Sequence, residues 1–427
     1  MNLIEHTIYK TDKGLRILEI SMPHMHSAEI GIFIRTGPVF EPLELSGISH
    51  FLEHMMFRGT KKYPCLTSLM REVENYGGTL EASTSREHVE FFYNSHPKYI
   101  KKGLDVLFDI LKNSQFMNID SERTIILEEY LDTVNDDGET IDIDQLSRTL
   151  IFGAENPLAR PILGTKSSIE SITSSQIEAW HKKNISIENM VVSIAGNYDP
   201  SDVEYIKMLF ADLEIGTKNI YPEIVKSGAK QRFHYSTSNM SQSMAMFSFL
   251  GIKNNDEFFI PYVLLWKILD GGMSSRLYSK ICGDLGLAYD VDASIENYYS
   301  TGIFDIFVTV SHDNIIAIYE SVMELLSDIV TKGVKKEEFE FAKRKYNFDI
   351  EMGMDDINLM TRWFGEKELY FQACSFKDRI DIINSATIDS VNEVAKQILN
   401  PDKMYFTLVG SKKRYAELNK YFLERIF

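Results

Sequence analysis

Apolar residues recur along the chain with two different spacings, and each spacing predicts one kind of element. Segments rich in β-branched and aromatic residues at 14–20 and 29–37 predict strands, and 78–95 returns to the same character. Between these strands, apolar residues follow helical spacing at about 46–57 and 66–76. The first part of the chain therefore has the pattern of helices packed on a sheet. The other helices predicted in this part span about 98–113 and 121–134.

The order of the predicted elements recurs in the second half of the chain. A strand at 243–251 precedes a helix at 258–271, and a pair of strands follows. Gly77 and Gly286 then take corresponding positions, separated by close to half the chain. We therefore predict an α+β fold of two homologous domains, each a mostly antiparallel sheet covered by helices, related by internal duplication. The aromatic-rich helices 258–271 and 359–372 are predicted to lie in the core.

The best candidate for a linker between the two domains lies at 215–230. Gly216, Pro222 and Gly228 occur in this segment without a clear hydrophobic period. The candidate metal ligands described below all precede it, so the first domain is predicted to be catalytic and the second to bind no metal. The predicted ranges are 1–217 for the first domain, 218–230 for the linker and 231–427 for the second domain.

Composition limits the class of protein. A chain of 427 residues suits two domains of roughly 200 residues each. Its net charge of -17, from 45 Lys+Arg and 62 Asp+Glu, argues against nucleic acid or an anionic membrane as the main partner. No apolar run reaches the roughly 18 residues that span a bilayer, and the first residues lack the pattern of a signal or transit peptide. Three widely spaced cysteines form neither a disulfide framework nor a zinc ribbon. These features together lead us to expect a soluble, cytoplasmic protein.

The segment SGISHFLEHMMFRGT, residues 46–60, carries the clearest chemical signal. On a helix its apolar residues form one stripe, and His50, Glu53 and His54 fall on the other side. Ser46 is the predicted N-cap. Two histidines one turn apart can both direct a ring nitrogen at one zinc ion, and a carboxylate between them is better placed to accept a proton from water. This arrangement is typical of a metallopeptidase, whereas a lone histidine on a helix is usually structural.

A third metal ligand is expected from the helix predicted at 121–134. It offers Glu122, Glu128 and Glu129. Glu122 and Glu129 are nearly two turns apart and share a face, while Glu128 lies about 100° away around the helix. Only one of the two adjacent glutamates can face the histidines, and the spacing alone does not choose between them.

These motifs together carry a resemblance to a known family. The pattern His50-x-x-Glu53-His54, the sequence FRGT at 57–60 and a glutamate about 75 residues further on resemble the inverted-motif zinc peptidases of the pitrilysin/insulysin family. That family includes the mitochondrial processing peptidases, and this chain is similar to its single-length, two-domain bacterial type. Further family-like stretches lie at 77–84, 122–129, 156–165, 189–199 and 271–291.

The resemblance implies a role for each of several residues. The implied roles are His50, His54 and Glu129 as ligands of one zinc ion per chain, Glu53 as the general base, and Glu122 as a carboxylate that supports the ligands. Glu128 remains the alternative to Glu129 as the third ligand.

The chain departs from the family pattern at two places. Relatives have Asn-Ala where this chain has Glu81 and Ala82, in the strand that the family pairs with the substrate backbone. Tyr289, a substrate contact in the family, is kept, but Cys282 replaces the arginine seven residues before it. A thiol cannot donate the guanidinium's fork of hydrogen bonds, and Arg276 matches a different, structural part of the motif. We assign Glu81, Ala82 and Tyr289 to substrate binding.

The family also implies a partner and an activity. Two such chains close around a chamber, with the second domain of one facing the zinc domain of the other. We therefore expect a heterodimer whose similar-length partner lacks the zinc motif and keeps the Arg–Tyr pair; a homodimer is the alternative. The expected function is a zinc metalloendopeptidase that cleaves peptides or unfolded segments, and the alternative is a non-enzymatic or partly active subunit of such a peptidase. His88 lies near the substrate strand. A place in the substrate cleft is the alternative, and a position on the surface of the strand is the prediction.

Overall fold

A computed structural model describes residues 4–224, 231–370 and 373–426. Contacts divide the chain into two compact units, each built from separate segments of the sequence. The boundary predicted near 217 and the roles of the two halves stay predictions, and residues 225–230 of the predicted linker lie outside the described residues. Unit 1 comprises Met1–Tyr130, Pro161–Pro222 and Ile350–Arg379, and unit 2 comprises Leu131–Arg160, Glu223–Asp349 and Ile380–Phe427.

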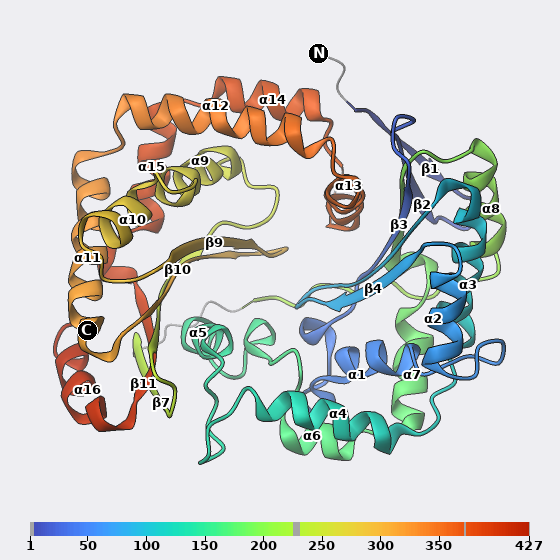
Figure 1. The fold of residues 1–427 in the computed structure, drawn as a ribbon, viewed down its shortest axis with the longest axis horizontal. Helices are drawn as coiled ribbons and strands as arrows, with labels where there is room; N and C mark the ends of the chain where they lie inside the picture. The colour runs from blue at the N-terminus through green and yellow to red at the C-terminus, as the bar shows by residue number, and fades with distance from the viewer. Residues whose placement is uncertain (1–3, 225–230, 371–372, 427) are drawn as a thin grey trace. The chain divides into compact units, whose positions relative to one another are not determined.

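Unit 1 is organised on a six-stranded sheet with the order β1-β2-β6-β3-β5-β4 (Figure 1). The pair β2–β6 is parallel and the other pairs are antiparallel. Strand β4 ends the sheet, and among the described residues no strand pairs with its outer edge. The strands are β1 (His6–Lys10), β2 (Arg16–Ser21), β3 (Ala28–Ile34), β4 (Thr79–Thr84), β5 (Val89–Ser95) and β6 (Met190–Gly196).

Unit 2 repeats this arrangement on a five-stranded sheet with the order β7-β11-β8-β10-β9. Here the pair β7–β11 is parallel and the others are antiparallel, which matches unit 1 once β1 is left aside. The predicted fold class, two homologous α+β units with mostly antiparallel sheets, is thereby confirmed. The strands are β7 (Phe233–Ser238), β8 (Ser243–Gly251), β9 (Val291–Asn297), β10 (Gly302–Val310) and β11 (Tyr405–Ser411).

Helices cover both sheets. Those that contribute to unit 1 are α1 (Ile48–Met56), α2 (Leu66–Glu74), α3 (Ile100–Asn113), α4 (Ile119–Leu131), α6 (Lys166–Ser171), α7 (Ser174–Asn184), α8 (Pro200–Phe210) and α13 (Ile357–Tyr370). Those that contribute to unit 2 are α5 (Ile143–Phe152), α9 (Phe259–Asp270), α10 (Arg276–Tyr278), α11 (Ile315–Lys332), α12 (Lys336–Gly353), α14 (Phe376–Ser385), α15 (Ile388–Ile398) and α16 (Tyr415–Leu423).

One helix of each half of the sequence packs on the sheet of the other half. Helix α13 lies on β3 and β6 of unit 1, and α5 lies on β8 and β11 of unit 2 (Figure 1). Small residues permit the close approach of α13: a Cβ on Gly365 would lie 2.1 Å from the ring of Phe33, and one on Gly31 would lie 2.6 Å from Thr361. The last two residues of the helix predicted at 359–372 lie outside the described residues.

Each unit has its own core. In unit 1 the predicted apolar stripe of α1 is buried with residues of β3, β5 and α3. In unit 2 an aromatic cluster joins the sheet to α11 and α16. The rings of Phe247, Phe406, Tyr319 and Phe422 pack together with centroids 4.8–6.0 Å apart, mostly tilted or edge to face. Beneath α5 the buried guanidinium of Arg148 pairs with Asp305 at 2.8 Å. Asn219, at the start of the predicted linker, is buried in unit 1 and donates to Asn184.

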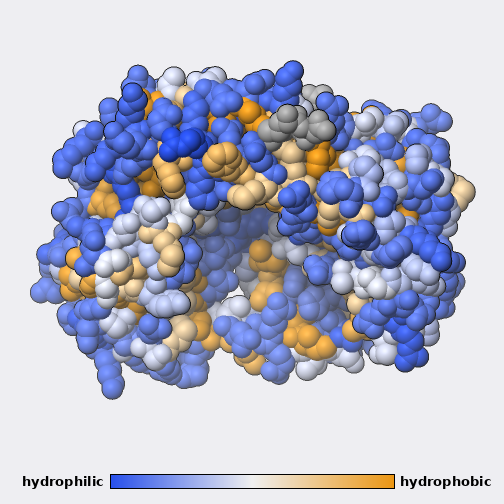
Figure 2. Space-filling model, turned by 45° about the horizontal axis from the view of Figure 1, so that its top comes forward, coloured by the Kyte–Doolittle hydropathy of each residue, from blue (hydrophilic) through white to orange (hydrophobic). Residues whose placement is uncertain are grey.

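The face of the molecule drawn in Figure 2 is mainly polar. Hydrophilic residues cover most of the face drawn in Figure 2, and apolar ones occur there in small groups. Among the described residues, no helix combines the length and the apolar character that crossing a membrane would need.

Candidate metal centre

Helix α1 is held at its N-terminus by a buried carboxylate. Glu41 accepts hydrogen bonds from the backbone N–H groups of Gly47, at 2.7 Å, and Ser49, at 2.9 Å. Gly47 occupies the cap position with φ 87°, a left-handed conformation that favours glycine. The prediction of Ser46 as the N-cap was wrong, because Glu41, five residues further back, satisfies the helix amides instead and complements the helix dipole.

The structure brings His50, His54 and Glu129 together. The imidazole rings of the two histidines have centroids 4.5 Å apart. Glu129 Oε2 on α4 lies 3.7 Å from His50 Nε2 and 3.8 Å from His54 Nε2. Glu128 is exposed and does not join this cluster. Across residues 4–224, 231–370 and 373–426, these three side chains are the group of His, Cys, Asp or Glu whose ligand atoms lie close enough to share an ion, within 4.8 Å of one another.

The donor set fits zinc. Two ligand atoms at about 2.1 Å from a tetrahedral zinc ion lie roughly 3.4 Å apart, close to the separations in this cluster. Two imidazole nitrogens with one carboxylate oxygen would leave a fourth position open for a small molecule, as catalytic zinc sites require. Burial and the neighbouring His54 lower the pKa of His50 to about 3, so its ring is neutral and has a lone pair available for a cation.

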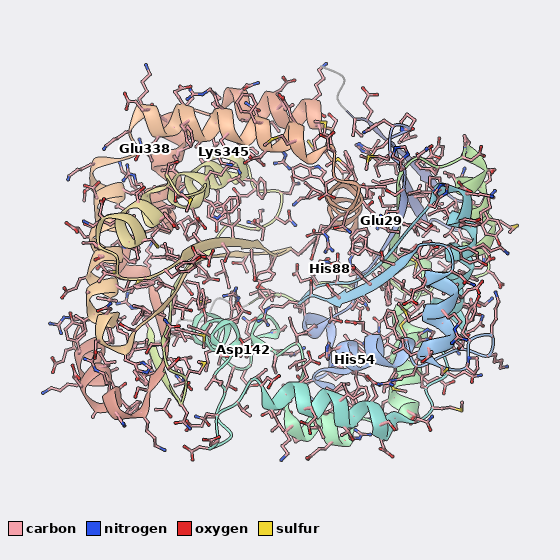
Figure 3. All side chains as sticks on the ribbon, in the orientation of Figure 1. Glu29, His54, His88, Asp142, Glu338 and Lys345 are labelled. Carbon is pink, nitrogen blue, oxygen red and sulfur yellow. The ribbon has the colours of Figure 1, made fainter. Side chains whose placement is uncertain are left out.

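A second carboxylate orients His54, whose position on α1 is labelled in Figure 3. Glu122 Oε1 lies 2.8 Å from His54 Nδ1, and since a carboxylate only accepts, Nδ1 carries the proton and Nε2 presents its lone pair toward Glu129. Glu122 is buried, and its other oxygen forms an ion pair with Nε of Arg58, one turn beyond His54 on the chain. This role of Arg58 was not predicted, although its spacing of four residues from His54 indicated a shared helix face.

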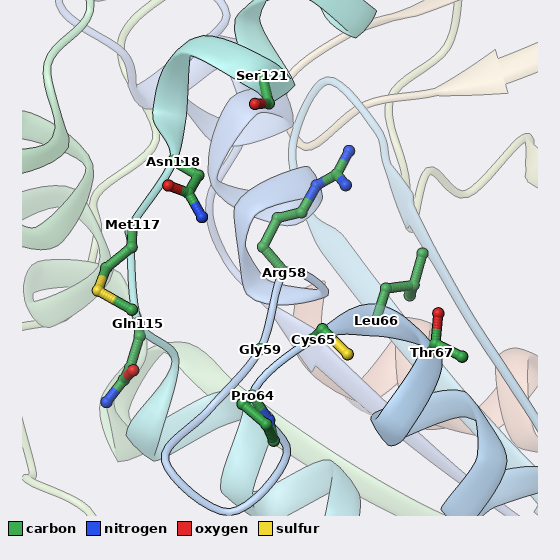
Figure 4. A pocket seen from close by; sticks show the side chains of 10 residues that line it. All are labelled: Arg58, Gly59, Pro64, Cys65, Leu66, Thr67, Gln115, Met117, Asn118 and Ser121. Carbon is green, nitrogen blue, oxygen red and sulfur yellow. The ribbon is translucent and has the colours of Figure 1, made fainter.

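A cavity of about 360 Å³ lies beside this ion pair, with Arg58 among its lining residues (Figure 4). Arg58 therefore borders this cavity and also pairs with Glu122. The lining residues are Arg58, Gly59, Pro64, Cys65, Leu66, Thr67, Gln115, Met117, Asn118 and Ser121.

Glu53 lies beside the three candidate ligands without belonging to their cluster. Its Oε2 accepts a hydrogen bond of 2.7 Å from the hydroxyl of Thr84, the last residue of strand β4. Burial raises the pKa of Glu53, although the hydrogen bond from Thr84 and the nearby His54 oppose the shift. Thr84 was not predicted as a site residue; its position at the end of the family-like stretch 77–84 was the only signal for it.

The predicted substrate-binding residues lie in both units. Glu81 is exposed and Ala82 is half-buried on the edge strand β4, whose end reaches Glu53 through Thr84. Tyr289 belongs to unit 2, lies 96% exposed and is not part of the metal-ligand cluster.

The residues around the second departure are also in unit 2. Cys282 is half-buried, and burial together with two nearby aspartates raises the pKa of its thiol. Arg276 forms an ion pair of 2.7 Å with Glu338, which agrees with the structural role expected for it. The guanidinium of Arg276 is therefore engaged with Glu338 in this structure.

The surface position predicted for His88 was wrong. Its side chain is buried just before strand β5, and its Nδ1 lies 3.0 Å from the hydroxyl of Tyr370 on α13. The prediction failed because nothing in the local sequence shows that a helix some 280 residues away covers this strand.

Comparison with known proteins identifies the class. Residues 16–166 match the family model described as insulinase (peptidase family M16), and residues 171–346 match the model of the peptidase M16 inactive domain. Together these models cover more than half of the chain, so the protein belongs to peptidase family M16, and the resemblance seen in the sequence is confirmed.

Individual relatives agree with this membership. The chain is 27% identical over 405 residues to the uncharacterized zinc protease YmxG of Bacillus subtilis, covering 92% of this chain and 96% of the relative. It is 25% identical over 394 residues to the uncharacterized zinc protease ML0855 of Mycobacterium leprae, covering 91% and 88%.

Two solved structures share the fold. A protease from Helicobacter pylori has a TM-score of 0.86 at 17% identity, covering 96% of this chain and 100% of that one. A Pseudomonas fluorescens structure titled peptidase M16 inactive domain has a TM-score of 0.84 at 18% identity, covering 96% and 98%.

Proposed function

We propose that this chain is a zinc metalloendopeptidase. His50, His54 and Glu129 bind one zinc ion, and Glu53 is the general base. The observation that carries the proposal is the cluster of three ligand atoms within 4.8 Å, contributed by two helices, with the Glu53 carboxylate beside it. Membership of a peptidase family, with relatives named zinc proteases, supports the same assignment.

The chain's own residues define the proton path. Zinc, when bound, would polarise the scissile carbonyl and make a water molecule more acidic. Thr84 holds Oε2 of Glu53, so we assign Oε1 to accept the proton from the attacking water. Glu53 then returns this proton to the nitrogen of the leaving amine. Glu122 keeps His54 in the tautomer that has a lone pair on Nε2 throughout the cycle.

The substrate is an extended peptide or an unfolded segment. Strand β4 ends its sheet, and an extended backbone can pair with such an edge through main-chain hydrogen bonds. Its last residue, Thr84, contacts the proposed base, so a strand added at this edge would pass the metal centre. The exposed carboxylate of Glu81 on the same strand would favour basic side chains in the substrate.

A partner chain completes the substrate site. Cys282 stands where active relatives have an arginine, so we propose a heterodimer in which a similar-length partner without the zinc motif supplies the Arg–Tyr pair around a closed chamber. A homodimer is the alternative assembly. If the purified chain alone cleaves peptides as fast as it does after mixing with such a partner, the heterodimer proposal is wrong.

Zinc content and peptide hydrolysis test the catalytic assignment. Glu53→Gln should keep one zinc ion per chain and lose about 100- to 10,000-fold in turnover of an unstructured peptide, because only the proton transfer is removed. Glu129→Gln should lower zinc content, whereas the matched change Glu128→Gln, on the adjacent exposed residue, should leave it unchanged. Full activity of the Glu53 variant would exclude this mechanism.

A second function is favoured by one observation. The cysteine at 282 leaves the substrate-binding half of the family pattern incomplete, as expected for a partly active or non-enzymatic subunit of a heterodimeric peptidase. Such a subunit would bind peptide without hydrolysing it, alone or after mixing with a partner, even with zinc bound. The same hydrolysis assay therefore separates the two functions.

A further inference from the structure

A buried polar network in unit 1 lies outside the metal centre, and Glu90 on strand β5 is at its middle. Glu90 is 1% exposed. Its Oε1 accepts a hydrogen bond of 3.1 Å from the hydroxyl of Ser83 on the edge strand β4 and pairs with the guanidinium of Arg362 on α13. Its Oε2 lies 3.6 Å from Nε2 of His88. One carboxylate thus connects the edge strand of the sheet to a helix from the other half of the sequence.

A second attachment joins the same helix to the same hairpin. The hydroxyl of Tyr370 lies 3.0 Å from Nδ1 of His88, and the two rings meet edge to face with centroids 5.9 Å apart. The guanidinium of Arg362 also lies over the ring of Phe92, 4.4 Å from its centroid. Helix α13 therefore contacts the start of strand β5 and the turn before it through Arg362 and Tyr370, which lie about two helical turns apart.

The network continues from β4 to the proposed base. Ser83 is followed directly by Thr84, which donates to Glu53. The turn that links β4 to β5 is closed by a hydrogen bond from the N–H of Ser85 to the carbonyl of His88, at 2.8 Å. A contiguous series of contacts therefore runs from α13 through β5 and β4 to Glu53.

The charges in this network are well matched. Burial raises the pKa of Glu90, but the charge of His88, 3.6 Å away, and the guanidinium of Arg362 outweigh it and leave the pKa below its usual range. Burial lowers the pKa of His88, but Glu90 and two further carboxylates outweigh it and leave that pKa raised. Replacing a buried ion pair with apolar residues often leaves stability unchanged. We therefore infer that this ion pair serves mainly to position the segments it joins, rather than to stabilise the fold.

We propose that Glu90, His88, Arg362 and Tyr370 form a positioning network through which helix α13 sets the place of the edge strand β4, and with it the alignment of the peptide substrate with Glu53. This inference rests on the proposed function, since it assigns β4 to substrate binding. Glu90, His88, Arg362 and Tyr370 contact one another, Ser83 and Phe92. We therefore expect the network to act on substrate alignment and to leave metal binding unchanged.

Glu90→Gln is the first test, because it keeps the shape of the side chain and removes the charge that holds Arg362 and His88. Loss of a hydrogen bond to a charged group predicts an increase of about tenfold in KM for an unstructured peptide, with a smaller change in kcat. Zinc content should stay at the wild-type value. Hydrogen–deuterium exchange of the amides of 79–84 should become faster, because the strand is less firmly held.

Two further variants make the test specific. Tyr370→Phe removes one hydroxyl and should raise KM and the exchange rate in the same direction by a smaller factor. Glu338→Gln breaks another glutamate–arginine pair, with Arg276 in unit 2, and should leave exchange at 79–84 unchanged. If Glu90→Gln does not fold, Tyr370→Phe decides the question alone.

Binding measurements separate this inference from the proposed function. Metal-free protein carrying Glu53→Gln should bind a fluorescent unstructured peptide, and adding Glu90→Gln should weaken the Kd about tenfold. This result supports the network even if the wild-type chain hydrolyses nothing, in which case the catalytic proposal fails by itself. Unchanged KM, Kd and exchange at 79–84 in the folded variants would overturn the positioning role.

Discussion

Glu122 offers the sharpest test of the metal centre, because it contacts a proposed ligand and not the proposed ion. Its carboxylate is 3% exposed, lies 2.8 Å from Nδ1 of His54 and is charge-balanced by Arg58. In Glu122→Gln the amide oxygen can still accept from Nδ1, but the negative charge that makes the imidazole a better donor to a cation is lost. Glu122→Ala removes the acceptor as well and leaves Arg58 without its partner.

Outer partners of this kind typically contribute 10- to 100-fold in metal affinity. We expect Glu122→Gln to weaken zinc binding about tenfold, near 1.4 kcal/mol, and Glu122→Ala to approach 100-fold. The affinity is measured by competition between the metal-free protein and a chromogenic zinc chelator. Glu128→Gln, the same change at an exposed position of the same helix, is the matched control and should bind zinc as the wild type does.

Two outcomes would refute this reasoning. A Glu122→Gln protein whose zinc affinity stays within about twofold of the wild type would mean that the carboxylate does not act on the ligand. An equal loss in Glu128→Gln would mean that zinc affinity follows the overall charge of helix α4 and not the contact with His54. Circular dichroism of each metal-free variant shows whether a loss of affinity arises from unfolding instead.

Other predictions concern catalysis, stability and domain structure. Thr84→Val should lower kcat about tenfold with zinc content unchanged, because the base loses its hydrogen bond; an unchanged kcat would contradict the assigned contact. Arg148→Met leaves the carboxylate of Asp305 buried without its cation, so it should lower the free energy of unfolding by about 3–5 kcal/mol in urea titrations. An unchanged midpoint would show that the ion pair is not buried in solution. Because the pKa of His88 is raised in the folded state, protonated His88 stabilises the fold fully below about pH 6.5, and this stabilisation is lost as the pH rises through the folded-state pKa. His88→Gln should remove this part of the pH dependence of the urea midpoint. An identical pH dependence in the variant would show that His88 does not contribute to it. The fragment 1–217 lacks helix α13 and should not unfold cooperatively when heated; a sharp transition would show that the first half folds alone.

Local chemistry made the first part of the candidate metal centre predictable. His50, Glu53 and His54 lie within five residues on one amphipathic helix, so their shared side follows from the period of that helix alone. The strands and most helices were also predictable, because their hydrophobic periods are set by burial of one face against a sheet. The repeat was visible as a repeated order of elements, and the matching strand orders of the two sheets bear it out.

Contacts between distant segments were not predictable in the same way. The spacing of Glu122, Glu128 and Glu129 left two candidates for the third ligand, and only the packing of α4 against α1 places Glu129 near both histidines. The capping of α1 by Glu41 depends on the fold of the loop before the helix and was missed for that reason.

Helix α13 shows most clearly what the sequence pattern alone does not predict. Its aromatic residues predicted burial, and burial is what a hydrophobic pattern encodes. The pattern does not encode which surface provides that burial, because the hydrophobic effect is non-directional and any apolar face of suitable shape would serve. Shape complementarity, with glycines at 31 and 365 that let the helix approach the sheet closely, selected the sheet of the opposite half. Residues of the second half thereby came to lie against His88 and Glu90, close to the strand that reaches the proposed base.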